Sequence, residues 1–325
     1  MSFEQLMQHA HDIRATATAK ALEQHGVREA PKPGDPPFAP RPGEDASRAS
    51  IVAGFADIVS LFEPFAMMPD PATFDGPILD LLNGLQYLAV GVKPIDPITG
   101  HPLITNLVMD RVGASESYLE EWTGDAADAF RSDLVHPFLL IVMNQLIGCS
   151  VLRSALMAQR ALWVSAREDI DKVAHATLTA LDNMGHCGQN TWTMSWTIVS
   201  SIAAVAAVPI SAGTSLLGEA AALGTATAVT AVGAAGQVAA AYQVEPEKET
   251  TYHGETAEAV IEQMRHGVNQ AISEIQQGEQ LIAAALRSVS GTVRQSRRAF
   301  VGPQPKLLDA TSRTVFDEWY LGRAR

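Results

Sequence analysis

Hydrophobic positions recur every three or four residues along most of the chain, a spacing typical of amphipathic helices. Apolar residues at this spacing predict one very long helix over residues 125–183, with Pro137 and Gly148 as the places where it bends. Other helices are predicted over residues 3–28, 48–68, 74–90, 104–121 and 255–300. We therefore expect an all-α protein built from long antiparallel helices, because a helix of such length must lie against a partner.

Proline-rich stretches divide these predicted helices into domains. Residues 30–45 carry six prolines and predict a stiff, extended linker, and residues 92–103 predict a loop. The predicted organisation is an N-terminal helix (1–30), a Pro-rich linker (31–47), a helical domain (48–183), a hydrophobic uncharged helical hairpin (184–244), and a long C-terminal helix with a basic tail (245–325).

The predicted hairpin contains two uncharged stretches, 197–217 and 220–242, separated only by Gly218 and Glu219. Each is long enough to cross a bilayer, which takes about 20 residues. The residues on which this depends are Ile198, Val205, Val208, Leu217, Gly218, Glu219, Gly224 and Gly233. Two interpretations stay open, since an Ala/Gly-rich hairpin can insert into a membrane or pack inside a soluble bundle or an oligomer.

Charge and composition narrow the class of function. The formal net charge is −13, which argues against a nucleic-acid partner. The two cysteines do not make a disulfide scaffold. The opening stretch MSFEQLMQHAHDIRATA is polar where a secretory signal needs an apolar core, so any export is expected without a cleavable Sec signal peptide.

No constellation of residues predicts catalysis. The nine histidines are scattered, His186-Cys187 lacks a second ligand pair at metal spacing, and nucleotide-binding and hydrolase fingerprints are absent from the sequence. We expect no enzyme activity, cofactor or metal. The C-terminal stretch 287–325 holds eight basic and three acidic residues, and the preferred interpretation is pairing with the acidic stretch 245–282 rather than with anionic lipid.

One short stretch, EEWTGDAADAF at residues 120–130, lies at the predicted turn between two helices. Gly124 can take a positive φ and reverse the chain, and Asp125 is a natural N-cap for the next helix. Small residues and Phe130 then permit close approach of the two arms. Taken alone, Trp122-x-Gly124 also fits a buried Trp beside a helix-ending glycine.

The constellation W-T-G-D-A-A-D-A-F resembles the turn of the WxG-motif helical-hairpin proteins exported by type VII (ESX) secretion systems of actinobacteria and firmicutes. The resemblance covers residues 104–183. It implies that two antiparallel helices meet at Trp122 and Gly124, and that Trp122 is half of a composite export signal. The other half in that family, Tyr-x-x-x-Asp/Glu, is absent from this sequence, and Trp163 with Glu168 is the nearest substitute.

The resemblance implies a non-enzymatic secreted or cell-envelope-associated protein, which binds secretion machinery or a helical protein partner and self-associates. Two alternatives remain. One is an α-helical pore-forming toxin-like protein that inserts residues 197–242 into a membrane. The other is a soluble oligomeric scaffold held together by the same segment.

Overall fold

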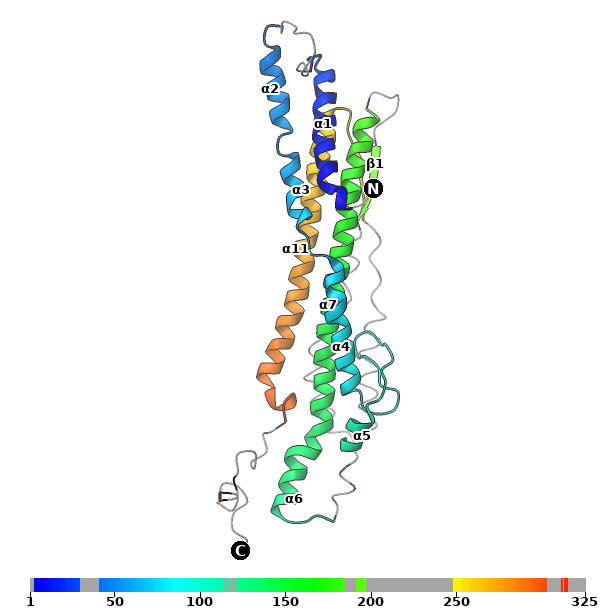
Figure 1. Ribbon diagram of the computed structural model, residues 1–325, viewed down its shortest axis with the longest axis vertical. Helices are drawn as coiled ribbons and strands as arrows, with labels where there is room; N and C mark the ends of the chain where they lie inside the picture. The colour runs from blue at the N-terminus through cyan, green and yellow to red at the C-terminus, as the bar shows by residue number, and fades with distance from the viewer. Residues whose placement is uncertain are drawn as a thin grey trace. The chain divides into compact units, whose positions relative to one another are not determined.

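The computed structural model describes residues 3–29, 41–113, 121–184, 191–196 and 248–302, together with Ser115, Ser117, Thr311, Arg313 and Thr314. The protein is all-α, with one short two-stranded ribbon in the described part (Figure 1). The helices are α1 (Leu6–Gln24), α2 (Glu44–Gly54), α3 (Ile58–Ala66), α4 (Asp75–Leu88), α5 (Leu107–Gly113), α6 (Asp125–Phe130), α7 (His136–Asp182) and α11 (Ala257–Gln295). Short 3₁₀ turns cover Phe3–Gln5, Pro71–Phe74 and Arg297–Ala299.

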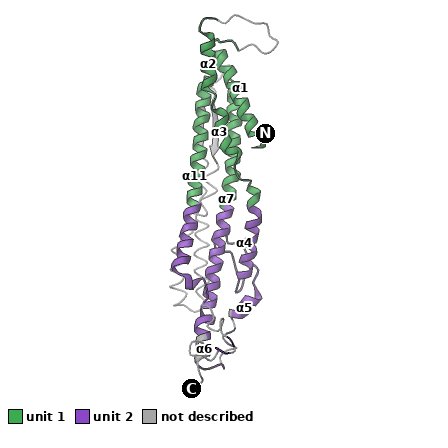
Figure 2. Cartoon of the chain, turned by 60° about the vertical axis from the view of Figure 1, so that its left-hand side comes forward, with its two compact units in different colours: residues 1–73, 158–203, 244–281 green, residues 74–157, 204–243, 282–325 purple. Residues whose placement is uncertain are grey.

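The chain forms two compact units, to both of which α7 and α11 contribute (Figure 2). Unit 1 comprises residues 1–73, 158–203 and 244–281, and unit 2 comprises residues 74–157, 204–243 and 282–325.

Unit 1 has a core built by four helical segments. Its buried apolar side chains recur at helical spacing on α1, α3, the second part of α7 and the first part of α11, and include Leu6, Ile13, Ile58, Phe62, Leu162, Ile170, Ile261 and Met264. In the predicted helix 255–300, the apolar residues at helical spacing that fall in unit 1 are buried, and they form an apolar stripe on α11 at Val260, Met264, Val268 and Ile275. Fully burying side chains of this size contributes about 1.5–3 kcal/mol each, so this stripe holds α11 in the unit.

Unit 2 packs α4 against the first part of α7. Leu85, Ala89, Leu103 and Leu146 form its buried cluster. The helices approach closely at Gly84, where an added Cβ would lie 3.5 Å from the Cys149 Sγ. Small residues at this crossing therefore allow the two backbones to come together.

The predicted helices 48–68 and 104–121 differ from the observed elements. The first is broken by a turn at residues 55–57 into α2 and α3, and Pro64 lies inside α3. In the second, the described α-helix is α5, Leu107–Gly113, and residues 104–106 precede it without helical structure. Helical spacing survives a single turn in the backbone, so hydrophobic periodicity alone cannot locate such breaks.

The predicted helix 125–183 is interrupted once, by a π-helical turn at Arg131–Val135 between α6 and α7. The turn lies directly before Pro137. A proline inside a helix lacks the N–H that would bond the carbonyl four residues back, and its ring crowds that carbonyl, here Asp133. One wider turn relieves this conflict while the helix continues.

Part of the predicted helical hairpin 184–244 is a strand instead, in a two-stranded antiparallel ribbon of unit 1. Strand β1 (Thr191–Trp196) pairs with β2 (Lys248–His253), with Thr191 opposite His253 and Trp196 opposite Lys248. Thr, Trp and Tyr in these strands favour extended backbone. The neighbouring Ala-rich composition concealed this short signal in the sequence.

Candidate interaction surface

Trp122 and Gly124 form a corner before α6 in unit 2. Gly124 has φ 105° and ψ 170°, a region open essentially only to glycine, and it is the N-cap of α6. Asp125 is therefore the first helical residue and not the N-cap, which corrects that expectation. The Trp122 and Phe130 rings lie 5.5 Å apart with planes tilted by 54°, an aromatic pair across the first turn of the helix.

The Trp122 side chain is exposed rather than buried, so the alternative of a core tryptophan does not hold. Its exposed fraction is 43%, and that of Phe130 is 38%. The Arg131 guanidinium donates a hydrogen bond to the Trp122 carbonyl oxygen and lies 3.9 Å from the Asp128 carboxylate. The backbone of the corner is thus tied to α6 and the following turn while the two aromatic rings face outward.

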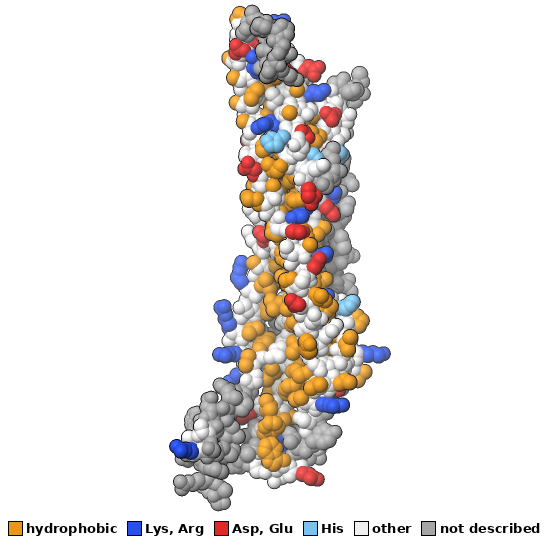
Figure 3. All heavy atoms as spheres, viewed as in Figure 1, with side chains coloured by type: hydrophobic (Ala, Val, Ile, Leu, Met, Phe, Trp, Pro, Cys, Tyr) orange, Lys and Arg blue, Asp and Glu red, His pale blue; other side chains and the backbone are white. Residues whose placement is uncertain are grey.

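Other exposed apolar side chains of unit 2 lie on α4, the loop after it, and α5. We name this set the α4–α5 apolar surface, which comprises Leu79, Tyr87, Val92, Ile104, Leu107, Val108 and Val112. Exposed fractions reach 95% at Val92 and 70% at Val108. Hydrophobic side chains gather on the lower half of the face drawn in Figure 3. Exposed apolar side chains gathered in this way are typical of interaction sites.

A buried polar cluster fixes the loop that carries part of this surface. Asp96 is fully buried, and its carboxylate accepts hydrogen bonds from the backbone N–H groups of Ile98 and Thr99. From α7, the Ser150 hydroxyl donates to the same carboxylate, and the Arg153 Nη1 lies 3.0 Å from Asp96 Oδ2. Asp96 therefore closes the turn of the loop and joins it to α7.

Asp96 was not among the site residues predicted from the sequence. Its signal was local, because an Asp followed by Pro97 and then Gly100 is typical of a turn closed by the carboxylate. The partners of Asp96 on α7, Ser150 and Arg153, carry no such local sequence signal, since their positions fit an ordinary helix face. Burial, followed by the negative charge of Asp96, raises the pKa of the neighbouring Cys149 thiol.

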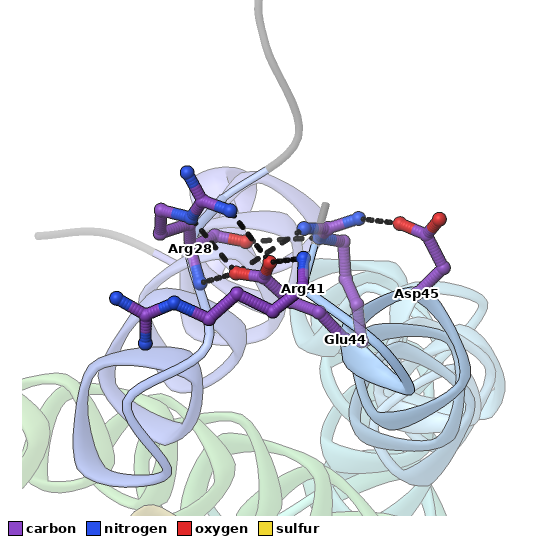
Figure 4. A network of polar contacts seen from close by, with 5 residues as sticks. Arg28, Arg41, Glu44 and Asp45 are labelled. Atoms are coloured by element: carbon purple, nitrogen blue, oxygen red, sulfur yellow. Dashed lines mark hydrogen bonds and ion pairs between the residues drawn. The ribbon is translucent and has the colours of Figure 1, made fainter. Parts of the chain in front are cut away.

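A second polar cluster lies in unit 1, where Glu44 begins α2 (Figure 4). Its carboxylate accepts hydrogen bonds from the backbone N–H groups of Arg28 and Arg41, at 3.1 and 2.8 Å, and from the Arg28 guanidinium. The pKa of the Glu44 carboxyl is lowered, most strongly by the Arg28 guanidinium and next by these backbone N–H groups. One carboxylate thus binds the chain on both sides of the proline-rich residues 31–40.

The remaining predicted site residues are dispersed. Trp163 is half-buried and Glu168 is exposed, both on the α7 part of unit 1. Trp122 belongs to unit 2. The predicted membrane residues, Ile198, Val205, Val208, Leu217, Gly218, Glu219, Gly224 and Gly233, lie outside the described residues. Within the described part of the chain, no group of three or more His, Cys, Asp or Glu side chains could hold a metal ion.

Two described stretches have the length and composition of membrane-spanning helices, Glu44–Leu88 and Arg131–Asp182. Their most apolar windows are 28% and 39% buried. The first stretch is divided into α2, α3 and α4, and core helices of soluble proteins have the same composition. Composition alone therefore gives weak evidence for a membrane span here.

No protein-family model, curated protein or solved structure matches this chain.

Proposed function

We propose that this is a non-enzymatic helical protein of the WxG type, exported by a type VII-like route, which acts by binding another helical protein through unit 2. The observation that carries the proposal is the Trp122–Gly124 corner. Its glycine has the positive φ that a chain reversal needs, and its tryptophan is exposed beside Phe130 at the start of a long helix.

The α4–α5 apolar surface supports the binding part of the proposal. Leu107 and Val108 are 66% and 70% exposed, although both are large and apolar. Covering such side chains with the apolar face of a partner helix gains roughly 25 cal/mol per Å² of apolar area removed from water. Aromatic residues such as Tyr87 and Trp122 are typical anchors of protein interfaces.

Secretion of Trp122→Ala tests the export part of the proposal. In a host with a type VII system, we expect the variant to accumulate in cells while wild type appears in the culture supernatant. Met67→Ala is the control, because it removes a large exposed apolar side chain from unit 1 that belongs to neither half of the predicted signal, and it should be secreted as wild type is. Equal secretion of Trp122→Ala and wild type would refute the signal role of Trp122.

A second candidate function is membrane insertion of the uncharged segment 197–242, and the ribbon favours it. Trp196 and Lys248, which flank this segment closely, are paired in β1 and β2, so the chain leaves and returns at one place. A hairpin that enters a bilayer from one side needs such an arrangement. The predicted readout is release of a dye from liposomes, abolished by Val205→Asp with Val208→Asp.

Release of the dye from liposomes, together with secretion that does not depend on Trp122, would favour the pore-forming alternative. If neither lipid binding nor secretion is seen, and the chain is a stable oligomer in solution, the soluble scaffold would be the remaining function.

A further inference from the structure

The C-terminal end of α11 in unit 2 presents a group of exposed arginines. We name Arg287, Arg294, Arg297 and Arg298 the arginine stripe. Arg287 and Arg294 are seven residues apart on α11 and so lie on one face, about 10 Å apart along the axis. Arg297 and Arg298 follow in the 3₁₀ turn. Figure 3 shows basic side chains gathered along the lower half of α11.

The backbone beneath the stripe is held in place. Two neighbouring amides on α7 donate hydrogen bonds to carbonyls directly after Arg298: Asn144 Nδ2 to Ala299 O at 2.8 Å, and Gln145 Nε2 to Phe300 O at 2.7 Å. The turn therefore has a fixed position on α7, and the guanidinium groups extend from it into solvent.

The arginines of the stripe contrast with others in the same chain. Arg28, Arg48, Arg153 and Arg265 each lie within ion-pair distance of a carboxylate. Among the described residues, no carboxylate forms an ion pair with an arginine of the stripe. In the acidic stretch 245–282, Glu258 pairs instead with His25, and Glu262 with Arg265. The expected pairing of the basic end with this stretch is therefore not observed in the described part.

Stabilisation of the helix end does not account for the whole stripe. Cations in the last turn interact favourably with the helix dipole, but the effect falls off within that turn. Arg287 lies eight residues before Gln295, where α11 ends. A chain with net charge −13 that keeps four cations together and exposed has a local charge suited to an anionic partner.

We propose that the arginine stripe docks this protein on an anionic membrane surface, as a peripheral contact of phosphate groups with guanidinium groups. Two arginines of the stripe lie along α11 and two in the turn after it, and exposed small polar residues such as Ser288 and Ser290 lie near Arg287, which suits a flat field of phosphates. Val301, 49% exposed directly after the turn, adds an apolar contact. The inference goes beyond the proposed function and requires neither Trp122 nor the segment 197–242.

Flotation of the full chain with vesicles tests this docking. Wild type is mixed with phosphatidylcholine vesicles and with vesicles containing phosphatidylglycerol as the anionic lipid. We expect binding to the anionic vesicles only, weakening as salt rises. Each arginine near an anionic surface contributes about fivefold in affinity, so Arg287→Gln with Arg294→Gln and Arg298→Gln should lower affinity on the order of 100-fold.

The matched control removes the same charge elsewhere, with Arg14→Gln, Lys20→Gln and Arg41→Gln in unit 1. We expect it to bind anionic vesicles as wild type does. Circular dichroism and size-exclusion chromatography verify that both triple variants fold. Equal binding by the stripe variant and wild type, no binding of wild type to anionic vesicles, or equal binding to both vesicle types would overturn the proposal.

A second copy of this acidic chain is the competing partner. Sedimentation of wild type without lipid, at low and high salt, tests it. If wild type self-associates at low salt, and the stripe variant loses that association but not vesicle binding, the stripe is a protein interface and the membrane proposal fails. Secretion of the stripe variant is measured separately, so failure of docking is distinguishable from failure of the export proposal.

Discussion

Asp96 and Arg153 form an ion pair, 3.0 Å between oxygen and nitrogen, in which the carboxylate is fully buried. The pair joins the loop after α4 to α7, and through that loop it positions part of the α4–α5 apolar surface. Since the loop contributes few buried apolar side chains of its own, its position depends on this cluster.

Replacing Asp96 should therefore destabilise unit 2 strongly. We expect Asp96→Asn to lower the free energy of unfolding by about 3 kcal/mol, because it leaves the buried Arg153 charge without a partner. Urea denaturation followed by circular dichroism measures the change. Asp57→Asn is the control, since its partner Arg265 forms a half-exposed pair worth about 0–1 kcal/mol. A similarly small effect at Asp96 would contradict the role of this ion pair in joining the loop to α7.

Glu44 should make unit 1 sensitive to acid. Its pKa is lowered in the folded protein, so its contribution to stability is present above the unfolded value, about 4.3, and is lost as the pH falls below that value. Glu44→Gln should lower the denaturation midpoint at pH 7, and the difference from wild type should shrink below pH 4. Glu63→Gln, an exposed acid on α3, is the control. A difference that does not change with pH would show that the charge of Glu44 is not responsible.

Gly124 and Gly148 offer a matched pair of substitutions. Neither has an atom within 4 Å of an added Cβ, but only Gly124 has a positive φ. We expect Gly124→Ala to cost about 1–3 kcal/mol, or to alter the corner, because of backbone strain. Gly148→Ala, inside α7, should stabilise by up to about 1 kcal/mol. Thermal melts of both variants provide the comparison, and tolerance of Ala at Gly124 would argue against the corner geometry.

Cys149 should react slowly with alkylating reagents. Burial and the charge of Asp96 raise the pKa of its thiol, and only the thiolate attacks. In a Cys187→Ser background at pH 8, we expect iodoacetamide to label Cys149 severalfold more slowly in the folded protein than in urea. Asp96→Asn should speed the reaction, since it removes the negative charge and loosens the loop. Equal rates in the folded and unfolded states would contradict this account.

The sequence predicted the helical architecture because hydrophobic periodicity reports which face of a segment is buried. The stripe on α11 from Val260 to Ile275 is buried as its spacing required. The turn at residues 55–57 was missed because it leaves that periodicity almost unchanged, whereas the π-helical turn lies beside Pro137, where the sequence predicted a bend. The ribbon was missed because its pairing partners, such as Trp196 and Lys248, are far apart in the chain.

The candidate site was predictable only where its signal was local. Trp122 and Gly124 lie in one short motif, and the structure places their corner before α6. Two contacts join residues that are distant in sequence. They are the ion pair of Asp96 with Arg153, and the hydrogen bonds of the Glu44 carboxylate with Arg28. A charged residue in a predicted helix is assigned to the surface, because its distant partner is known only from the tertiary structure. These contacts could therefore not be inferred from the spacing of residues in the sequence.

The hydrogen bonds of the Glu44 carboxylate to the backbone at Arg28 and Arg41 also make residues 30–40 a suitable place for insertions. Because one carboxylate fixes Arg28 and Arg41, the placement of α2 beside α1 is set at Glu44, independently of the number of residues between them. For an inserted flexible segment, each doubling of the length costs only about 0.6 kcal/mol. An epitope or a fluorescent label introduced there would let export and vesicle binding be followed in the intact chain, at a distance in sequence from both Trp122 and the arginine stripe.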